Sequence, residues 1–252
     1  MATYYSRLER GKSNPSKPRF RSGEIWKRPP NRRAEAVRVV CGALQRAYGL
    51  PRLGNPPDPL DDLVYITISN KTGPLIANQT FMNLRTRFPN WNDVLRVPIS
   101  TVRKILRPAG LSSVKSRQLR AALRSIKQEF GDCDLRQLGD FPPEKIETFL
   151  VGLSGVSKKV AKCIMMYTLG AQVLPVDVHV HRIARRLGWT ARKRADQCHE
   201  ELESLVPPKR RYAFHVDCVL HGRRICRPHE PLCTDCCVRR SCAYFEKNAQ
   251  HR

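Results

Sequence analysis

Two neighbouring lysines and an aspartate are the residues of this sequence whose types and spacing could carry out covalent chemistry. Lys158 and Lys159 follow a short glycine-containing turn, and Asp177 follows an extended Leu-Pro-Val segment further along the chain. A lysine amine can attack an electrophilic carbon and form a Schiff base, and a nearby carboxylate can take up a proton or stabilise a cation. Either residue alone is more often a surface lysine or a helix N-cap, so the chemistry depends on what positions the pair.

The segment around the lysines is predicted to form a helix, a tight turn and a second helix. Residues 143–150 begin with prolines and glutamates and place apolar residues on one face, and a helical pattern resumes at Lys158. Gly155 stands where the turn needs positive φ. The backbone N–H groups of Gly155, Val156 and Ser157, with those of the second helix, would form a nest for a phosphate. Such a hairpin grips a DNA backbone without reading bases.

The composition also favours a nucleic-acid partner. The 252 residues carry 46 Lys and Arg against 22 Asp and Glu, a formal net charge of +24, and no apolar run is long enough to span a bilayer. The first residues lack the apolar core of a signal peptide, so we expect an intracellular protein that stays with the DNA, in the cytoplasm or nucleoid, or in a nucleus. In that setting the ten cysteines are metal ligands or buried thiols rather than disulfides.

Four cysteines near the C-terminus are candidate metal ligands. Cys226, Cys233, Cys236 and Cys242 follow the spacing C-x6-C-x2-C-x5-C in a tail with little apolar content. Four thiolates can hold a structural zinc or an iron–sulfur cluster. Zinc sites usually show two close pairs, whereas this tail has one, so the spacing leaves both metals open. Cys237 is an extra neighbour outside the pattern.

Two sequence motifs resemble those of a known family. Leu153-x-Gly155-Val156-x-x-Lys159-x-Ala161 and Val176-Asp177-x-His179-x-x-Arg182 resemble the helix-hairpin-helix and Gly/Pro-Asp signature of the endonuclease III superfamily of DNA glycosylases. The resemblance implies that Lys159 is the catalytic nucleophile, that Asp177 helps to deprotonate it and stabilises a cationic sugar, and that the four cysteines hold a [4Fe-4S] cluster. The family's turn usually ends in glycine, whereas this turn ends at Ser157, whose N–H can still donate.

The resemblance also implies an all-α fold with two helical lobes. A six-helix barrel would span residues 55–171 and include the helix-hairpin-helix at 143–170, while residues 36–54 and 172–252 would form an iron–sulfur cluster lobe. DNA would lie between the lobes. The basic, proline-containing segment 1–35 is expected to be a disordered arm that contacts DNA loosely or only aids solubility.

Several further DNA contacts are expected from the resemblance. The β-branched stretch 63–69 favours a strand by propensity but matches a family helix, and the turn after it holds Asn70 and Lys71, with Lys71 at the place of a Gln or Asn that fills the gap left by a flipped base. Ser112 matches a wedging position. Lys158 and His179 are further candidate phosphate contacts, although His179 could instead pack, or act as a ligand or acid. A long amphipathic helix near residues 113–130 presents a basic face, which is solvated or faces DNA: Lys115, Arg117, Arg120, Arg124 and Lys127.

These expectations combine into one predicted function. The chain would be a monomeric base excision repair glycosylase with AP lyase activity, which removes a damaged or modified base from duplex DNA. The lysine–aspartate pair favours a pyrimidine substrate. Residues 183–189 also resemble plant 5-methylcytosine glycosylases, so a 5-methylcytosine or mismatch-type enzyme stays an alternative, as does a non-catalytic iron–sulfur scaffold that binds DNA.

Overall fold

The computed structural model describes residues 25–249, and in this range the regular structure is helical, with no strand. The all-α class expected from the sequence is therefore confirmed for this part of the chain. The twelve α-helices are α1 (Pro30–Tyr48), α2 (Pro59–Ser69), α3 (Pro74–Arg87), α4 (Asn92–Arg96), α5 (Ile99–Leu106), α6 (Ser112–Phe130), α7 (Pro143–Gly152), α8 (Lys158–Thr168), α9 (Val178–Leu187), α10 (His199–Leu205), α11 (Arg211–Arg224) and α12 (Ala243–Ala249). None of the described helices is long and apolar enough to cross a membrane.

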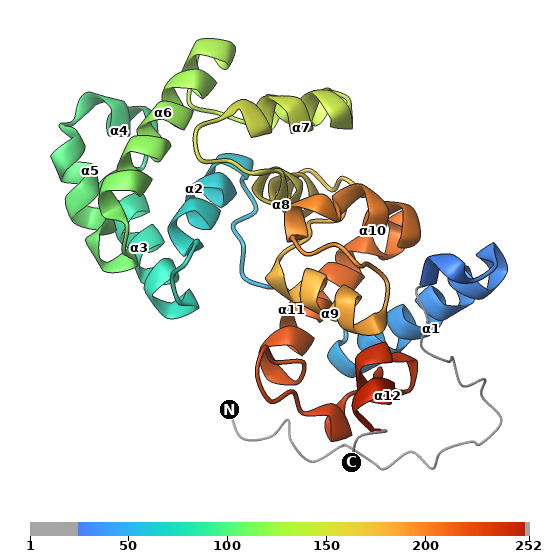
Figure 1. Ribbon diagram of the computed structural model, residues 1–252. Coiled ribbons are helices and arrows are strands. Elements are labelled where there is room, and N and C mark those ends of the chain that lie inside the picture. The colour runs from blue at the N-terminus through green and yellow to red at the C-terminus, as the bar shows by residue number, and fades with distance from the viewer. Residues whose placement is uncertain (1–24, 250–252) are drawn as a thin grey trace.

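Two hydrophobic cores organise these helices. The first is built from α2 to α8 and includes buried residues from Leu60 to Met165. The second joins α1 to the chain after α8, with buried residues between Ile25 and Leu44 and between Leu174 and Val238. Figure 1 shows α3 to α6 as one group and α1 with α9 to α12 as another, and α8, which packs on α2, lies between them.

Local capping explains why α2 is a helix despite its β-branched residues. The Asp58 carboxylate accepts hydrogen bonds from the N–H groups of Leu60 and Asp61 at 2.9 and 3.0 Å, and Pro59 occupies the first turn, where its missing N–H costs nothing. Burial of nearly the whole stretch then outweighs β propensity, which is the weaker preference. The helical choice for residues 63–69 is confirmed.

Residues 25–35, which the sequence analysis assigns to the basic arm, belong to the ordered fold. Ile25 is buried and its N–H donates to the Gly188 carbonyl at 3.0 Å, while the Trp26 indole N–H donates to the Trp189 carbonyl at 2.9 Å. Helix α1 then begins at Pro30. The expected arm can therefore extend only over residues 1–24, which lie outside the described residues.

The expected basic face of α6 needs one correction. Lys115 is buried, and its ammonium donates to the carbonyls of Ile68 and Ala109 at 2.7 and 2.9 Å and to the Thr72 hydroxyl at 2.8 Å. It was wrong to place Lys115 on a solvated or DNA-facing surface, because three acceptors replace its hydration inside the fold. Lys115 instead ties the end of α2 to the loop before α6.

Candidate active site and cysteine pocket

The turn between α7 and α8 needs a glycine. Gly155 has φ +83°, a left-handed conformation, and a Cβ atom at this position would lie 2.7 Å from the Gln118 side chain of α6. The Val156 side chain is buried and its N–H donates to the Leu153 carbonyl at 3.1 Å. Val156 therefore closes the turn, and its N–H group is already used within it.

The start of α8 leaves backbone donors available. Ser157 is the N-cap, and its hydroxyl oxygen accepts a hydrogen bond from the Val160 N–H at 3.4 Å. No acceptor in the described part of the chain contacts the N–H groups of Ser157, Lys158 and Lys159. Such free donors, aligned with the helix dipole, can bind a phosphate oxygen.

The two lysines of α8 have different surroundings. The Lys158 ammonium pairs with Glu200 of α10 and lies 3.3 Å from the Glu147 carboxylate of α7. The hydrogen bond to Glu200, followed by the charge of Glu147, raises the pKa of Lys158. Lys158 thus links α7, α8 and α10 through its side chain, whereas no ion pair of the half-buried Lys159 is found within the described residues.

Asp177 is the N-cap of α9. Its Oδ1 atom accepts hydrogen bonds from the N–H groups of His179 and Val180 at 2.9 and 2.8 Å, which fixes the orientation of the carboxylate. These bonds involve one oxygen, so the second oxygen of Asp177 lies outside the cap. An N-cap aspartate can therefore also offer negative charge to a neighbouring group.

Lys159 and Asp177 act on the same buried neighbours. Cys163 follows Lys159 by one helical turn, and burial raises its pKa to about 12, with Lys159 lowering and Asp177 raising this value. Burial lowers the pKa of His215 on α11, while Asp177 raises it and Lys159 lowers it. Two charges that act on the same thiol and the same imidazole lie within electrostatic range of each other. Lys159 and Asp177 therefore both act electrostatically on the buried Cys163 and His215.

His179 is directed into the protein rather than outward. Its Nδ1 atom lies 3.1 Å from the Arg182 guanidinium, and a Cβ atom on Gly222 of α11 would meet the same ring nitrogen at 2.4 Å. Burial lowers the pKa of His179, so the neutral ring is favoured. Its observed position is a packing contact between α9 and α11.

Two exposed turns lie side by side near the first core. Lys71, exposed with Asn70 at the end of α2, has φ +56°, and Leu111, just before α6, has φ +49° and is 57% exposed. The Thr72 hydroxyl donates to the Ala109 carbonyl at 2.7 Å and joins the two turns. Left-handed backbone at non-glycine residues is strained and tends to occur at functional sites.

Leu111 is a residue that the sequence analysis missed. The predicted wedge residue Ser112 is the half-buried first residue of α6, so the exposed apolar side chain of this turn belongs to Leu111. The available signal was a leucine between Gly110 and two serines, where a purely structural loop would need no large apolar side chain.

Asp62 is a second residue that the sequence did not reveal. It lies on α2 among apolar residues and is fully buried, and burial raises its pKa to about 7. The hydrogen bond from Asn55 and the positive charge of Lys159 both oppose this rise. The one available signal was a pair of acidic residues, Asp61 and Asp62, at the start of the mostly apolar stretch 60–68.

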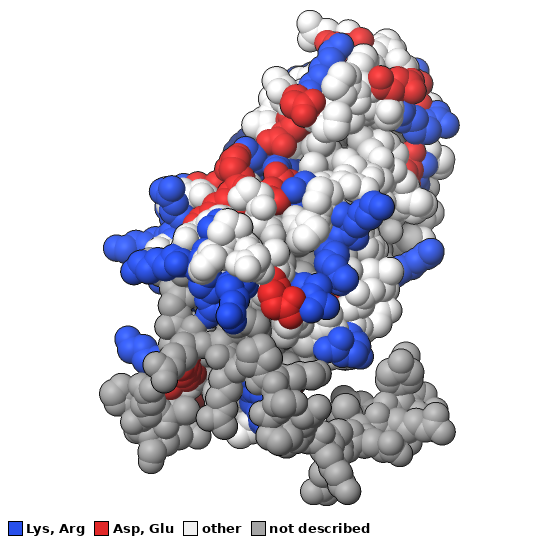
Figure 2. Space-filling view, turned by 90° about the vertical axis from the view of Figure 1, so that its right-hand side faces the viewer, with Lys and Arg blue, Asp and Glu red and all other residues white. Residues whose placement is uncertain are grey.

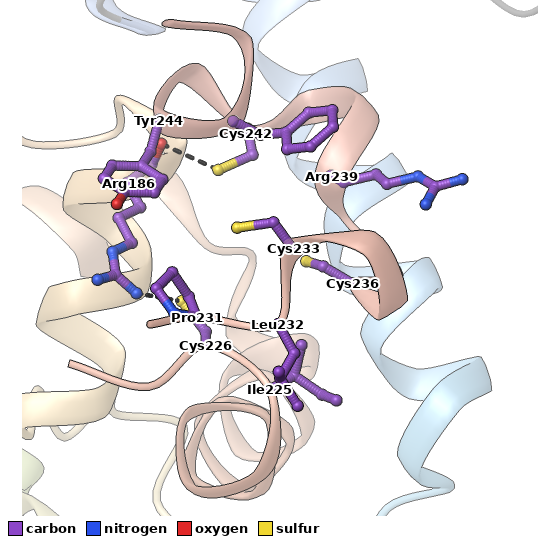
Figure 3. Close-up of a pocket in the computed structure, with 11 residues that line it drawn as sticks. Arg186, Ile225, Cys226, Pro231, Leu232, Cys233, Cys236, Arg239, Cys242 and Tyr244 are labelled. Atoms are coloured by element: carbon purple, nitrogen blue, oxygen red, sulfur yellow. Dashed lines mark hydrogen bonds between the residues drawn. The ribbon is translucent and has the colours of Figure 1, made fainter. Parts of the chain in front are cut away.

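The four predicted ligand cysteines line a single pocket in the C-terminal tail (Figure 3). Nevertheless, no three His, Cys, Asp or Glu side chains in the described residues converge closely enough to hold one metal ion. Four cysteines around one pocket are a ligand set that either a structural zinc or an iron–sulfur cluster can use. Cys237 is exposed and does not line the pocket.

Hydrogen-bond donors approach the sulfur atoms of this pocket. The Arg186 guanidinium donates to Cys226 Sγ at 3.2 Å and lies over the Tyr244 ring, and His221 Nε2 lies 3.4 Å from Cys236 Sγ. Figure 3 shows Arg186 and Tyr244 on one side of the pocket, while Arg239 points away from it. Donors of this kind suit thiolate sulfurs that carry negative charge.

Surface charge is unevenly distributed. In Figure 2 the Asp and Glu side chains gather mainly in the upper part of the face shown, and Lys and Arg side chains are spread over its middle and lower parts. An excess of positive charge on a surface attracts polyanions.

Comparison with known proteins places these features in a family context. A model of the HhH-GPD superfamily of base excision DNA repair proteins matches residues 64–208, more than half of the chain. An Arabidopsis thaliana protein named "Putative DNA glycosylase At3g47830" is 30% identical over 179 residues, which is 70% of this chain and 58% of that protein. Endonuclease III of Thermotoga maritima is 24% identical over 200 residues, which is 79% of this chain and 90% of the enzyme.

The fold also matches solved structures. The structure of a trapped endonuclease III–DNA covalent intermediate, an estranged-adenine complex, superposes with a TM-score of 0.74 and 20% sequence identity. The match covers 86% of this chain and 98% of that chain. At this identity the similarity establishes the fold.

Proposed function

The chain belongs to the HhH-GPD superfamily of base excision DNA repair proteins, and from this premise we propose that it is an endonuclease III-like DNA glycosylase with AP lyase activity. The observation that supports the proposal is that Lys159 lies in the first turn of α8, whose leading N–H groups are free to bind a phosphate, while Asp177 caps α9 through one oxygen only. A monofunctional glycosylase needs no amine at this position, whereas a Schiff-base enzyme does.

In the proposed reaction the free amine of Lys159 attacks C1′ of an extruded nucleotide. The C1′–N bond to the base breaks, and the electron pair leaves with the base, which takes up a proton. Asp177, held by its cap bonds, stabilises the positive charge that develops on the sugar. The nitrogen then loses a proton, the C1′–O4′ bond of the sugar breaks as O4′ takes up a proton, and the ring opens to the Schiff base. Loss of a C2′ proton from this Schiff base expels the 3′ phosphate by β-elimination, which nicks the strand.

DNA binding is proposed to use the hairpin and the two exposed turns. The free N–H groups at the start of α8 would bind a backbone phosphate. Lys71 would enter the gap left by the extruded nucleotide, and Leu111 would separate the neighbouring bases, because an exposed apolar side chain can unstack them. Lys115 would hold both turns at a fixed spacing.

The cysteine pocket is proposed to hold a [4Fe-4S] cluster through Cys226, Cys233, Cys236 and Cys242. When bound, the cluster would supply four metal–thiolate bonds that fix the tail after α11. Arg186 donates to a ligand sulfur and to the Arg227 and Pro228 carbonyls, so it orients the first ligand loop. This role is structural, and it positions basic residues of the tail beside DNA.

Borohydride trapping tests the proposal. Duplexes would carry an abasic site, thymine glycol, 5-hydroxycytosine, 5-methylcytosine or a G:T mismatch, and the proteins would be the wild type, Lys159→Gln, Asp177→Asn and Lys158→Gln. We expect a covalent adduct that Lys159→Gln abolishes and Asp177→Asn slows by roughly 100-fold or more. Lys158→Gln should slow it by less than about tenfold, since its side chain is paired with Glu147 and Glu200.

The outcomes separate the candidate functions. The base that gives the fastest adduct identifies the substrate, including the 5-methylcytosine alternative. An adduct that survives Lys159→Gln would contradict the assignment of the nucleophile. Wild-type protein that binds these duplexes but forms no adduct would favour a monofunctional glycosylase or a non-catalytic scaffold.

A further inference from the structure

His221 of α11 contacts two of the four cysteines of the pocket. Its carbonyl accepts hydrogen bonds from the N–H groups of Ile225 and Cys226 at 2.9 and 2.8 Å, where the chain leaves α11 for the cysteine loop. Its Nε2 atom lies 3.4 Å from the Sγ atom of Cys236. The residue is only 1% exposed, so the imidazole is enclosed with these partners. His221 therefore touches the first predicted ligand through its backbone and the third through its side chain.

The other ring nitrogen of His221 is bound by the last residue of α1. The Tyr48 hydroxyl lies 2.8 Å from His221 Nδ1, and the two rings meet edge to face with their centroids 5.8 Å apart. Helices α1 and α11 pack on each other, and α1 ends at Tyr48 because Gly49 takes a left-handed conformation at the C-cap. The imidazole is thus held at both nitrogens and cannot rotate without losing a hydrogen bond.

The three polar groups determine which ring nitrogen carries the hydrogen. A metal-bound thiolate has no hydrogen and can only accept, so a hydrogen bond to Cys236 requires the hydrogen on Nε2 of His221. In the neutral ring Nδ1 is then an acceptor, and the Tyr48 hydroxyl is the donor that it needs. The donors therefore form one chain, from the Tyr48 O–H to His221 and from the His221 N–H to the Cys236 sulfur.

Packing alone does not require these polar groups. Two apolar rings could keep the edge-to-face contact between α1 and α11, and an enclosed imidazole is costly unless both of its nitrogens are hydrogen-bonded. Arg186 of α9 already donates to Cys226, and Figure 3 shows Cys236 on the other side of the pocket from Arg186. His221 thus supplies a donor to a sulfur that Arg186 does not reach.

We propose that Tyr48 and His221 are positioning residues that place an N–H donor on the Cys236 thiolate and thereby raise the reduction potential of the cluster, an inference that rests on the [4Fe-4S] cluster of the proposed function. Hydrogen bonds to the sulfurs are among the features that set the potential of such a cluster. A donor stabilises negative charge on sulfur, and this charge is larger in the form that carries one more electron. The reduced form of each couple therefore gains more, and a cluster with a structural role keeps its oxidation state.

The test is a spectroelectrochemical titration of the purified, cluster-loaded protein, after the iron content of each sample has been measured. His221→Phe keeps a ring and removes the donor, so the potential should fall. We expect the ratio of oxidised to reduced cluster at a fixed potential to rise roughly 3- to 10-fold, which is a shift of about 30–60 mV for a one-electron couple. Tyr48→Phe should shift the potential in the same direction by less, because it removes only the group that fixes the tautomer.

Two further variants separate the donor from the packing. His221→Gln replaces the ring by an amide whose N–H can still donate to the sulfur, so its potential should lie closer to the wild type than that of His221→Phe. Tyr212→Phe is the matched control, because Tyr212 is also on α11 but packs on Tyr167 and does not line the cysteine pocket. Its potential should equal that of the wild type.

Each outcome has a distinct meaning. Loaded Tyr48→Phe and His221→Phe proteins with the wild-type potential would overturn the inference and leave the proposed function in place. Equal shifts in His221→Phe and His221→Gln would overturn it as well, since the lost ring rather than the lost donor would then be responsible. If His221→Phe takes up no iron, Tyr48→Phe decides, because it removes a single oxygen atom.

The proposed function fails in different ways. Wild-type protein purified with zinc, or without iron, would overturn the assignment of the cluster and the inference with it. Borohydride trapping on the same samples reports Lys159 separately, and we expect all four loaded variants to trap as the wild type does, since none of the substituted residues lies in the hairpin. Loaded wild-type protein that forms no adduct would overturn the lyase chemistry alone.

Discussion

At the residue scale, the two buried carboxyls without full hydrogen bonding are the most informative side chains. Asp62 lies on α2, which packs in the first core, and Asp217 lies on α11, which packs against α1 in the second core. Both Asp217 oxygens lack a partner within the described residues, and burial raises the pKa of Asp217 to about 6. Asp62 keeps one hydrogen bond, from Asn55, whereas Asp217 keeps none within the described structure.

This difference predicts how Asp217→Asn changes stability with pH. The folded chain holds the Asp217 proton up to about pH 6, whereas the unfolded chain loses it near 3.8. Stability therefore falls as pH rises between these two values and stays lower above them. Asp217→Asn removes this penalty, so it should stabilise the protein by about 1–3 kcal/mol at pH 8 and have little effect near pH 4. Urea unfolding at both pH values measures this, and an equal change at both would contradict it.

The sequence predicts the residues of a motif better than the partners that surround them. Lys159 and Asp177 follow from local spacing, and in the structure both affect the pKa of the buried Cys163 thiol. Asp62 could not be assigned in this way, because its burial depends on how α2 packs on its neighbouring helices. Lys115 shows the same limit, since a lysine on a helix with other basic residues looks solvated until its three acceptors are known.

At the element scale, α8 is held to the second core by a buried ion pair. The Lys162 side chain is 4% exposed and binds Glu203 of α10 at 2.5 Å. The other Glu203 oxygen accepts a hydrogen bond from the Leu174 N–H at 2.6 Å, just before the segment that leads to Asp177. Glu203 therefore fixes both α8, which carries Lys159, and the segment from Leu174 that leads to Asp177.

Replacing Glu203 alone should lower the stability of the folded protein. Glu203→Gln leaves the Lys162 ammonium buried with only the more distant Glu147, at 3.6 Å, so we expect a loss of about 2–4 kcal/mol in the free energy of unfolding. Trapping should also slow, because the Lys159 to Asp177 geometry loosens. The double variant Lys162→Met with Glu203→Gln should regain much of the stability, as it leaves no unpaired charge. A double variant less stable than Glu203→Gln would argue against this account.

Helix positions were predicted closely where capping and apolar spacing agree, and less well where tertiary contacts decide. The segments that became α6 and α8 are both clear from the sequence, since an apolar stripe marks the first and a glycine-containing turn precedes the second. Helix α1 begins earlier than expected because Trp26 and Ile25 dock on the turn after α9. Helix α12 was missed, as its seven residues carry little periodicity.

At the scale of the whole molecule, few segments of the chain connect the two hydrophobic cores. The loop after α1 and the segment after α8 carry the chain between the cores, so the relative position of Lys159 and Asp177 depends on contacts between α8, α10 and α11. The cysteine tail belongs to the second core, where Cys226, Cys236 and Cys242 pack against it. Chemistry at Lys159 thus depends on the assembly of both cores.

The net charge of +24 predicts that DNA affinity depends steeply on salt. Each neutralised phosphate contributes about −0.9 to the slope of log affinity against log salt, so a slope of roughly −4 or steeper is expected. Residues 1–24 hold six of the 46 Lys and Arg, and their removal should flatten the slope by about 1–3. This deletion spares Ile25, whose N–H donates to the Gly188 carbonyl.

Two controls make the salt measurement specific to charge and to binding. Replacing residues 1–24 by an uncharged Gly/Ser segment of the same length should flatten the slope as much as deletion does, because the lost phosphate contacts are electrostatic. Lys159→Gln should change the salt slope by no more than about 0.9, the contribution of one phosphate contact, since one lysine contributes little to the total charge. The same variant should lose adduct formation. Fluorescence anisotropy on an uncleavable duplex, measured over a range of salt concentrations, gives the slope for each of these proteins. A wild-type affinity that is insensitive to salt would contradict an electrostatic origin of binding, and would leave the hairpin and the two exposed turns to supply the affinity alone.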